Sequence, residues 1–125
     1  MSMPDSLAVG MYSFDCQNAA VLAAFWAAVL GREVDDGATE AFATIGFHDD
    51  EGVTWMFHQP DRELPTGENR FMLDLGGRPD WGQQADRIQA LGATRISDNS
   101  QDGIRWVVFH DPEGNTFRIF APRPD

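Results

Sequence analysis

The sequence predicts an α+β fold built from two βαβββ modules, and two observations carry this prediction. Apolar residues recur at helical spacing before Leu30-Gly31 and again before Leu91-Gly92, 61 positions later. Strand-like segments surround both helices in the same order, and their first centres, Met11 and Met72, are also 61 positions apart. A module of this size cannot cover both faces of its own sheet. We therefore expect the two modules to pack together and share one sheet.

The first module begins with an apolar segment, Leu7–Phe14, which predicts a strand inside a sheet. Asp15–Asn18 can cap the following helix through their side-chain oxygens. Gly31 ends that helix, because glycine adopts the left-handed conformation without steric cost. Two segments separated by a polar turn then predict a hairpin: Ala41–Phe47 and Val53–His58.

The second module repeats this order. Arg70–Leu75 predicts a strand, Asp80 is a helix cap, and the helix ends at Gly92. Three strand segments follow, with turns at 98–103 and 111–115: Thr94–Ser97, Ile104–His110 and Thr116–Phe120.

The stretch between the modules predicts a linker, because Pro60, Pro65 and Gly67 stand there among charged residues and cannot sustain a strand ladder. We expect one domain over residues 1–125. Its first module spans about 7–59, its linker about 60–69 and its second module about 70–121.

The chain is acidic, with nine Lys and Arg against twenty Asp and Glu and a net charge of −11. Such a field repels phosphate backbones and anionic lipids, so neither nucleic acid nor membrane is an expected partner. It favours a cationic ligand, although surface carboxylates also serve solubility alone. A single cysteine, Cys16, excludes an internal disulfide and indicates a reducing compartment. No secretory signal or ~20-residue apolar run is present, and we expect a cytoplasmic protein.

Several motifs together resemble the glyoxalase/bleomycin resistance/dioxygenase (vicinal oxygen chelate) superfamily. Phe25–Gly31 is similar to its helix end, Asp111–Asn115 to its last hairpin, and Asn69–Leu75 with Leu91–Ala93 to a metal-poor, glyoxalase-like branch. The resemblance covers about Leu7 to Phe120. It implies two βαβββ modules that form a cupped mixed sheet with the helices outside and a small-molecule pocket inside, and it implies a homodimer. Members of the superfamily isomerise, open rings, dioxygenate or sequester drugs, so the fold does not decide the activity.

The resemblance also implies where metal ligands stand in metal-dependent members. The matching positions here are Met11, Trp55, Met72 and Arg118. Indole and guanidinium do not coordinate divalent ions, and thioether is a soft ligand. A shift by one residue brings in no better donor set. The sequence therefore predicts no metal and no cofactor.

Strand alternation predicts a mostly apolar ligand-binding lining with a few polar groups. Its residues are Met11, Ser13, Trp55, Phe57, Met72, Asp74, Arg118 and Phe120. The same side chains could instead close the cup as ordinary core.

Three functions remain open on this evidence. The first is binding or sequestration of an aromatic or cationic small molecule. The second is a metal-independent lyase or isomerase, in which Arg118 clamps a carboxylate and Asp74 accepts a proton; the alternative for this pair is a structural salt bridge. The third is a protein-interaction module that uses Trp81 or Trp106. For Trp106 we expect core packing, and whether the chain is an enzyme stays undecided.

The three histidines and the single cysteine are interpreted from their positions. His58 ends a strand and shares a face with Met56 rather than Trp55. His48 and His110 are expected to be turn histidines, and Cys16 an inert buried thiol.

Overall fold

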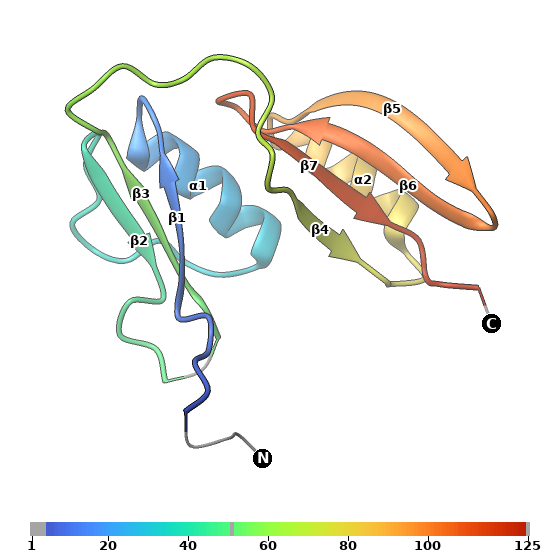
Figure 1. Ribbon diagram of the computed structural model, residues 1–125, viewed down its shortest axis with the longest axis horizontal. Coiled ribbons are helices and arrows are strands. Elements are labelled where there is room, and N and C mark those ends of the chain that lie inside the picture. The colour runs from blue at the N-terminus through green and yellow to red at the C-terminus, as the bar shows by residue number, and fades with distance from the viewer. Residues whose placement is uncertain (1–4, 51, 125) are drawn as a thin grey trace. The chain divides into compact units, whose positions relative to one another are not determined.

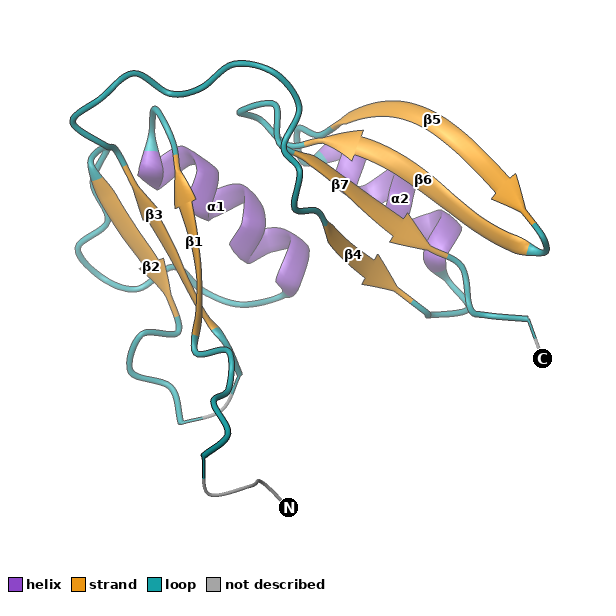
Figure 2. Cartoon of the chain, in the orientation of Figure 1, coloured by secondary structure: helices purple, strands orange, loops and turns teal. Residues whose placement is uncertain are grey.

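The computed structural model describes residues 5–50 and 52–124 and divides into two compact units, Met1–Leu64 and Pro65–Asp125 (Figure 1). Each unit holds one helix and one sheet (Figure 2). The α+β class and the two-module plan are confirmed. Within the described ranges, no helix is long and apolar enough to cross a bilayer.

The first unit contains a three-stranded sheet in the order β1-β3-β2, with β1 parallel and β2 antiparallel to β3. The strand at one edge is β1, and Leu7 and Val9 before it are 98% and 65% exposed. The expectation of an interior strand over Leu7–Phe14 is therefore wrong. The elements are β1 (Met11–Asp15), α1 (Ala19–Leu30), β2 (Phe42–Ile45) and β3 (Thr54–His58).

Helix α1 begins and ends where the sequence predicts. The Asn18 side chain accepts a hydrogen bond from the Val21 amide at 3.2 Å, which satisfies one free N–H group of the first turn. Gly31 has a φ of +68° and caps the other end in the left-handed conformation.

The second unit contains a four-stranded sheet in the order β4-β7-β6-β5, in which β4 runs parallel to β7. Its elements are β4 (Leu73–Gly76), α2 (Trp81–Ala90), β5 (Thr94–Gln101), β6 (Ile104–His110) and β7 (Thr116–Phe120). Both strands of the last predicted hairpin have the expected bounds. β5 extends past Ser97, with a register irregularity between Arg95 and Ser97, because its polar residues pair with β6.

Two local expectations in the second unit are met only in part, since Asp80 is the N-cap residue of α2 and the strand is shorter than expected. The strand starts at Leu73 rather than Arg70. Before it, the Asn69 side chain makes the hydrogen bonds to the first residue of β7 that a strand backbone would otherwise make. The Asn69 amide nitrogen donates to the Thr116 carbonyl at 3.0 Å, and the Asn69 side-chain oxygen accepts from the Thr116 N–H at 2.7 Å. Asp80 makes no side-chain cap bond to α2. Its carboxylate is instead bound by Arg78 and Gln84.

The strands form two sheets and not the one shared sheet that the sequence analysis expected. Every strand pairs within its own unit, since hairpins and helix crossovers connect neighbours along the chain. The first unit also falls short of the βαβββ pattern. Its extra strand is reduced to an isolated bridge between Val34 and Ile45.

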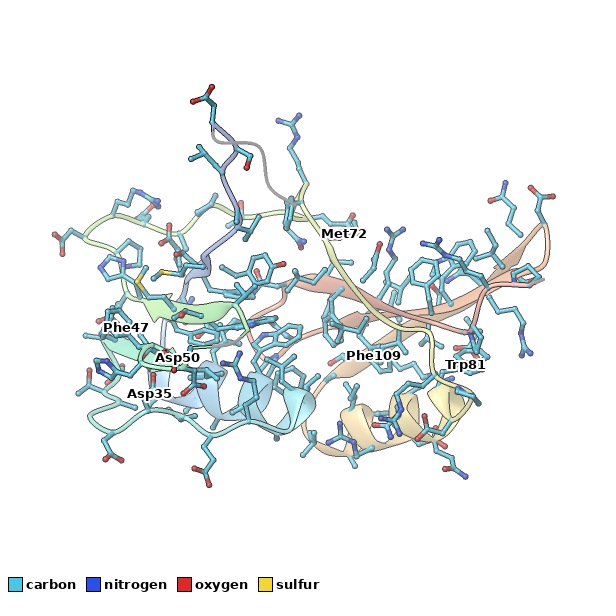
Figure 3. The ribbon with its side chains drawn as sticks, turned by 90° about the horizontal axis from the view of Figure 1, so that it is seen from below. Asp35, Phe47, Asp50, Met72, Trp81 and Phe109 are labelled. Atoms are coloured by element: carbon cyan, nitrogen blue, oxygen red, sulfur yellow. The ribbon has the colours of Figure 1, made fainter. Side chains whose placement is uncertain are left out.

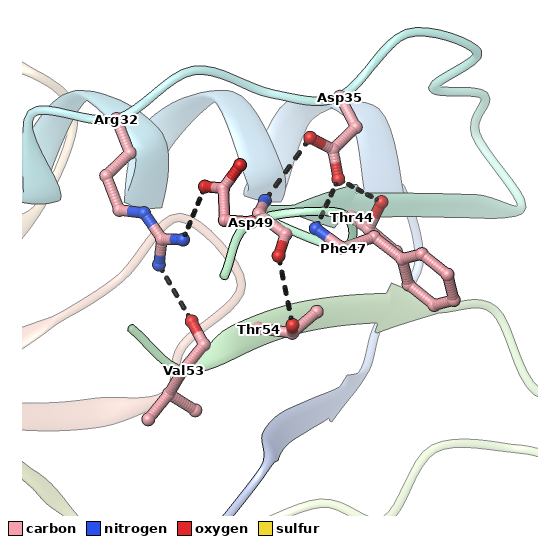
Figure 4. A network of polar contacts seen from close by, with 8 residues as sticks. Arg32, Asp35, Thr44, Phe47, Asp49, Val53 and Thr54 are labelled. Carbon is pink, nitrogen blue, oxygen red and sulfur yellow. Dashed lines mark hydrogen bonds and ion pairs between the residues drawn. The ribbon is translucent and has the colours of Figure 1, made fainter. Parts of the chain in front are cut away.

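A polar network holds the turn between β2 and β3 (Figure 4). The Asp35 carboxylate accepts hydrogen bonds from the Thr44 hydroxyl at 2.7 Å and the Phe47 amide at 2.9 Å. Arg32 donates to the Val53 carbonyl at 2.8 Å and pairs with Asp49 at 3.3 Å. Burial acts to raise the pKa of Asp35, but the hydrogen bonds from Thr44 and Phe47 outweigh it and hold that pKa below its ordinary value.

We expect Asp35→Ala to lower the free energy of unfolding by about 1–2 kcal/mol at pH 7, because it leaves the donors of Thr44 and Phe47 without their acceptor. A carboxylate whose pKa is lowered in the folded state stabilises the protein above its unfolded pKa, about 4, and loses that effect as the pH falls through the folded value. Urea unfolding should therefore show a smaller difference from wild type at pH 3 than at pH 7. Asp36→Ala, at the exposed neighbouring carboxylate, is the control; equal effects of both variants contradict the assignment.

Candidate functional site

The register of the first unit decides which side chains face α1. Tyr12 lies opposite Trp55, and Phe14 lies opposite Phe57, so these four rings share one face of the sheet. The Trp26 ring of α1 packs against that face, with its centroid 5.3 Å from Trp55 and 5.8 Å from Phe14. This is the hydrophobic core of the unit.

Trp55 and Phe57 are therefore core residues and do not line a pocket as the sequence analysis expected. They are 5% and 0% exposed. Met11 and Ser13, which were placed with them, point to the opposite side, which we call the far face of the sheet because it is turned away from the helix. The far face of the first unit carries Met11, Ser13, Asp15, Phe42, Thr44, Thr54, Met56 and His58.

A charged cluster lies at the end of this far face. Asp15 accepts a hydrogen bond from Arg62 at 2.6 Å, and its other oxygen lies 3.9 Å from Nδ1 of His58. His58 shares the face with Met56, as its sequence position predicts. The side chains of Asp15, His58 and Arg62 are all more than a third exposed, so solvent screens these interactions strongly.

In the second unit the register brings three of the predicted site residues onto one face. Asp74 lies opposite Arg118, and Phe120 follows two residues later on the same strand. Their face is turned away from the buried stack of Phe109 on Phe117 (Figure 3 labels Phe109). Met72 lies outside β4, just before its first residue.

Asp74 and Arg118 form a bidentate ion pair. Nε and one terminal nitrogen of Arg118 donate to the two carboxylate oxygens at 2.7 and 2.8 Å. The hydrogen bonds to Asp74 raise the pKa of the Arg118 guanidinium above its ordinary value, so this group stays cationic. The Arg118 side chain is 32% exposed and the Asp74 side chain 43%, so solvent reaches the pair.

Aromatic rings continue the same face toward the end of β7. The Phe120 ring lies 5.3 Å below the Arg118 guanidinium carbon and stacks on Trp106, with centroids 5.6 Å apart and planes 18° apart. Trp106 was expected in the core. Its strand places it opposite Phe120, whereas Val107 and Phe109 supply the core contacts.

A cavity of about 580 Å³ lies beside Phe120 and Asp74, and all of its lining residues belong to the second unit. Gly76 lines it at a close approach of two strands, where any side chain would collide with the Phe120 carbonyl. Its lining includes Asp74, Gly76, Gly77, Ile104, Phe120 and Arg123.

Thr116 was not predicted as a site residue. Its side chain lies on the same far face, opposite His110, and its hydroxyl is fully buried without a hydrogen-bond partner among the described residues. Unpaired hydroxyls of this kind are rare in native proteins. No sequence signal marks it, because threonine is an ordinary strand residue.

The sequence model of the glyoxalase-like domain family matches residues 11–120, which is most of the chain. The chain belongs to the glyoxalase-like domain family. Solved structures of the glyoxalase/bleomycin resistance/dioxygenase superfamily also match its fold.

Three of these structures illustrate the match. An enzyme of the superfamily from Burkholderia phytofirmans PsJN shares 18% identity over 93% of this chain and 99% of its own, with a TM-score of 0.75. A Nocardioides member shares 16% identity over 98% and 91%, with a TM-score of 0.73. The fosfomycin resistance protein FosX from Mesorhizobium loti shares 14% over 95% and 93%, with a TM-score of 0.67. Identities this low show the fold alone, and no curated protein matches.

The positions that the resemblance assigns to metal ligands carry no carboxylate or imidazole in this chain; they are Met11, Trp55, Met72 and Arg118. Trp55 faces the core, and the last-strand position on the far face of the first unit is Met56. Its counterpart in the second unit is Arg118, which is permanently cationic. Among the residues that the structure describes, no three His, Cys, Asp or Glu side chains are grouped to hold an ion.

The face assignment in the first unit can be checked by stability. Phe57→Ala should lower the free energy of unfolding by about 3–5 kcal/mol, because it empties a fully buried site beside α1. Met56→Ala, one residue away on the far face, should cost about 1 kcal/mol or less. Chemical denaturation of both variants measures the difference. A larger loss for Met56→Ala would place the strand in the opposite orientation.

Proposed function

We propose that this glyoxalase-like protein binds a small aromatic molecule on the far face of its four-stranded sheet. The observation that carries the proposal is the stacked pair of Trp106 and Phe120 beside the cavity, with Arg118 above Phe120. Flat apolar faces next to a few oriented polar groups are typical of small-molecule sites. Met72, Asp74, Arg118 and Phe120 remain site candidates, and Trp106 joins them.

Each part of the site has a separate task in this proposal. The rings provide contact area, and an aromatic pair adds about 0.5–1.5 kcal/mol beyond simple burial. Arg118 lies over the Phe120 ring that lines the cavity, and Asp74 holds its guanidinium in place, so little side-chain freedom is lost on binding. A ligand with a carboxylate near its ring suits the remaining terminal nitrogen of Arg118, since Nε and the other terminal nitrogen are bound to Asp74.

Binding without turnover fits the geometry better than catalysis. Asp74 would have to accept a proton in the metal-independent lyase or isomerase considered above, but both of its oxygens accept hydrogen bonds from Arg118. A protein-interaction role for Trp81 or Trp106 is also less favoured. Arg105 covers the Trp81 ring at 5.0 Å, and Trp106 stacks on Phe120.

The proposal includes a cytoplasmic, metal-independent homodimer. The buried Cys16 thiol, the single thiol of the chain, suits a reducing compartment, and Arg118 would repel a cation at the site. The dimer rests on the family resemblance alone.

We expect naphthalene-2-carboxylate to bind this face, and Phe120→Leu to weaken it about tenfold through loss of the stacked ring. Arg118→Ala should weaken it at least as much, because the carboxylate loses its partner. Isothermal titration calorimetry measures both effects. His58→Ala, in the first unit, is the control; if it matches Arg118→Ala, or if neither changes the affinity, Arg118 is not in the site.

Metal independence has its own measurement. Protein purified without chelator should contain no nickel, zinc, iron or manganese near one ion per chain by elemental analysis. Dialysis against a chelator should leave the affinity for naphthalene-2-carboxylate unchanged, since no ligand contact runs through an ion. A stoichiometric ion whose removal abolishes binding would refute this part of the proposal.

A further inference from the structure

A second cavity, of about 510 Å³, lies at the outer edge of the first unit's sheet. It is lined by Asp35, Asp36, Phe42, Thr44, Phe47 and His48. β2 is an edge strand of that sheet, and Phe42 points to its far face. The cavity therefore belongs to the first unit alone and shares no residue with the site proposed above.

Two aromatic rings stand open at this cavity. Phe42 and Phe47 are 44% and 53% exposed, although phenylalanine is among the residues most often buried. The His48 ring lies edge-on to Phe47, with centroids 5.0 Å apart. Ring faces left open in this way can receive a cation through their negative quadrupole.

The charge around the cavity is strongly negative. Residues 1–64 hold eleven Asp and Glu and only two Arg, so they carry −9 of the formal net charge of −11. Neither Arg is a lining residue of the cavity. Arg32 is bound to Asp49 and the Val53 carbonyl, and Arg62 is bound to Asp15.

The two carboxylates at the cavity differ in role. Asp35 is fixed by donors from Thr44, Gly46 and Phe47 (Figure 4), so it supplies a negative charge but has little capacity for further hydrogen bonds. Asp36 is exposed at the rim. A metal ion or a primary ammonium needs several free oxygen ligands, whereas a quaternary ammonium needs ring faces and nearby negative charge.

We propose that this cavity is a binding site for a quaternary ammonium group, held between Phe42 and Phe47 and neutralised by Asp35 and Asp36. The site is independent of the aromatic ligand on the second unit. Failure of one leaves the other standing.

The test compares choline with 3,3-dimethylbutan-1-ol, its uncharged isostere, in amide NMR titrations of the whole chain at constant ionic strength. Choline should give saturable shifts at the amides of Phe42, Phe47 and His48, because these residues line the cavity. The alcohol should not, since it lacks the charge. Equal shifts from both compounds, no saturable shift from choline, or shifts centred on Trp106 and Phe120 would each overturn the proposal.

Two variants separate the ring contribution from the charge. Phe47→Leu keeps an apolar side chain but removes the ring, and should weaken choline binding about fivefold. Asp36→Asn should weaken it about threefold, with less dependence on salt than wild type. Asp86→Asn, an exposed carboxylate in the second unit, removes the same charge elsewhere and should leave the affinity unchanged. The amide spectrum of each variant checks that it is folded; full affinity in both site variants refutes the site.

Discussion

The burial of one face of each sheet against its helix is the constraint on which the rest of the structure depends. In the first unit, Trp26 of α1 contacts Trp55 and Phe14, and this contact fixes the orientation of every residue in β1 and β3. Side chains alternate along a strand, so a shift of one residue would exchange core and far face together. Exposing Trp55 and Phe57 would cost several kcal/mol, far more than any far-face contact returns. The core thus determines which residues are left for function.

Elements with strong local signals could be predicted from the sequence, whereas the orientation of β3 could not. Gly31 and the Asn18 cap act within one turn of the helix, and the hairpin of β6 and β7 is set by its own turn. The residues of β3 are Thr-Trp-Met-Phe-His, so both of its faces carry apolar side chains and alternation alone does not choose between them. Trp55 and Phe57 were predicted to line the pocket, but both lie in the core.

The observed strand pairings of the two units resolve this choice. Ser13 lies opposite Met56 in the first unit, and Asp74 lies opposite Arg118 in the second, so the two pairs occupy equivalent positions. The first strands are related by 61 positions and the last strands by 62. Equating Trp55 with Arg118 requires an offset of 63, which breaks the register. Contacts between side chains, such as Trp106 on Phe120, depend on cross-strand pairing, and no sequence pattern predicts them.

Equivalent positions in the two units therefore carry different chemistry on the same backbone plan. Where the second unit has Asp74 and Arg118, the first has Ser13 and Met56, and where the second has Phe120, the first has His58. The excess negative charge is also confined almost entirely to the first unit. A ligand that suits the guanidinium and stacked rings of one unit is repelled by the carboxylates of the other. The shared fold accordingly says little about function, and each unit has to be understood from the side chains that its helix leaves uncovered.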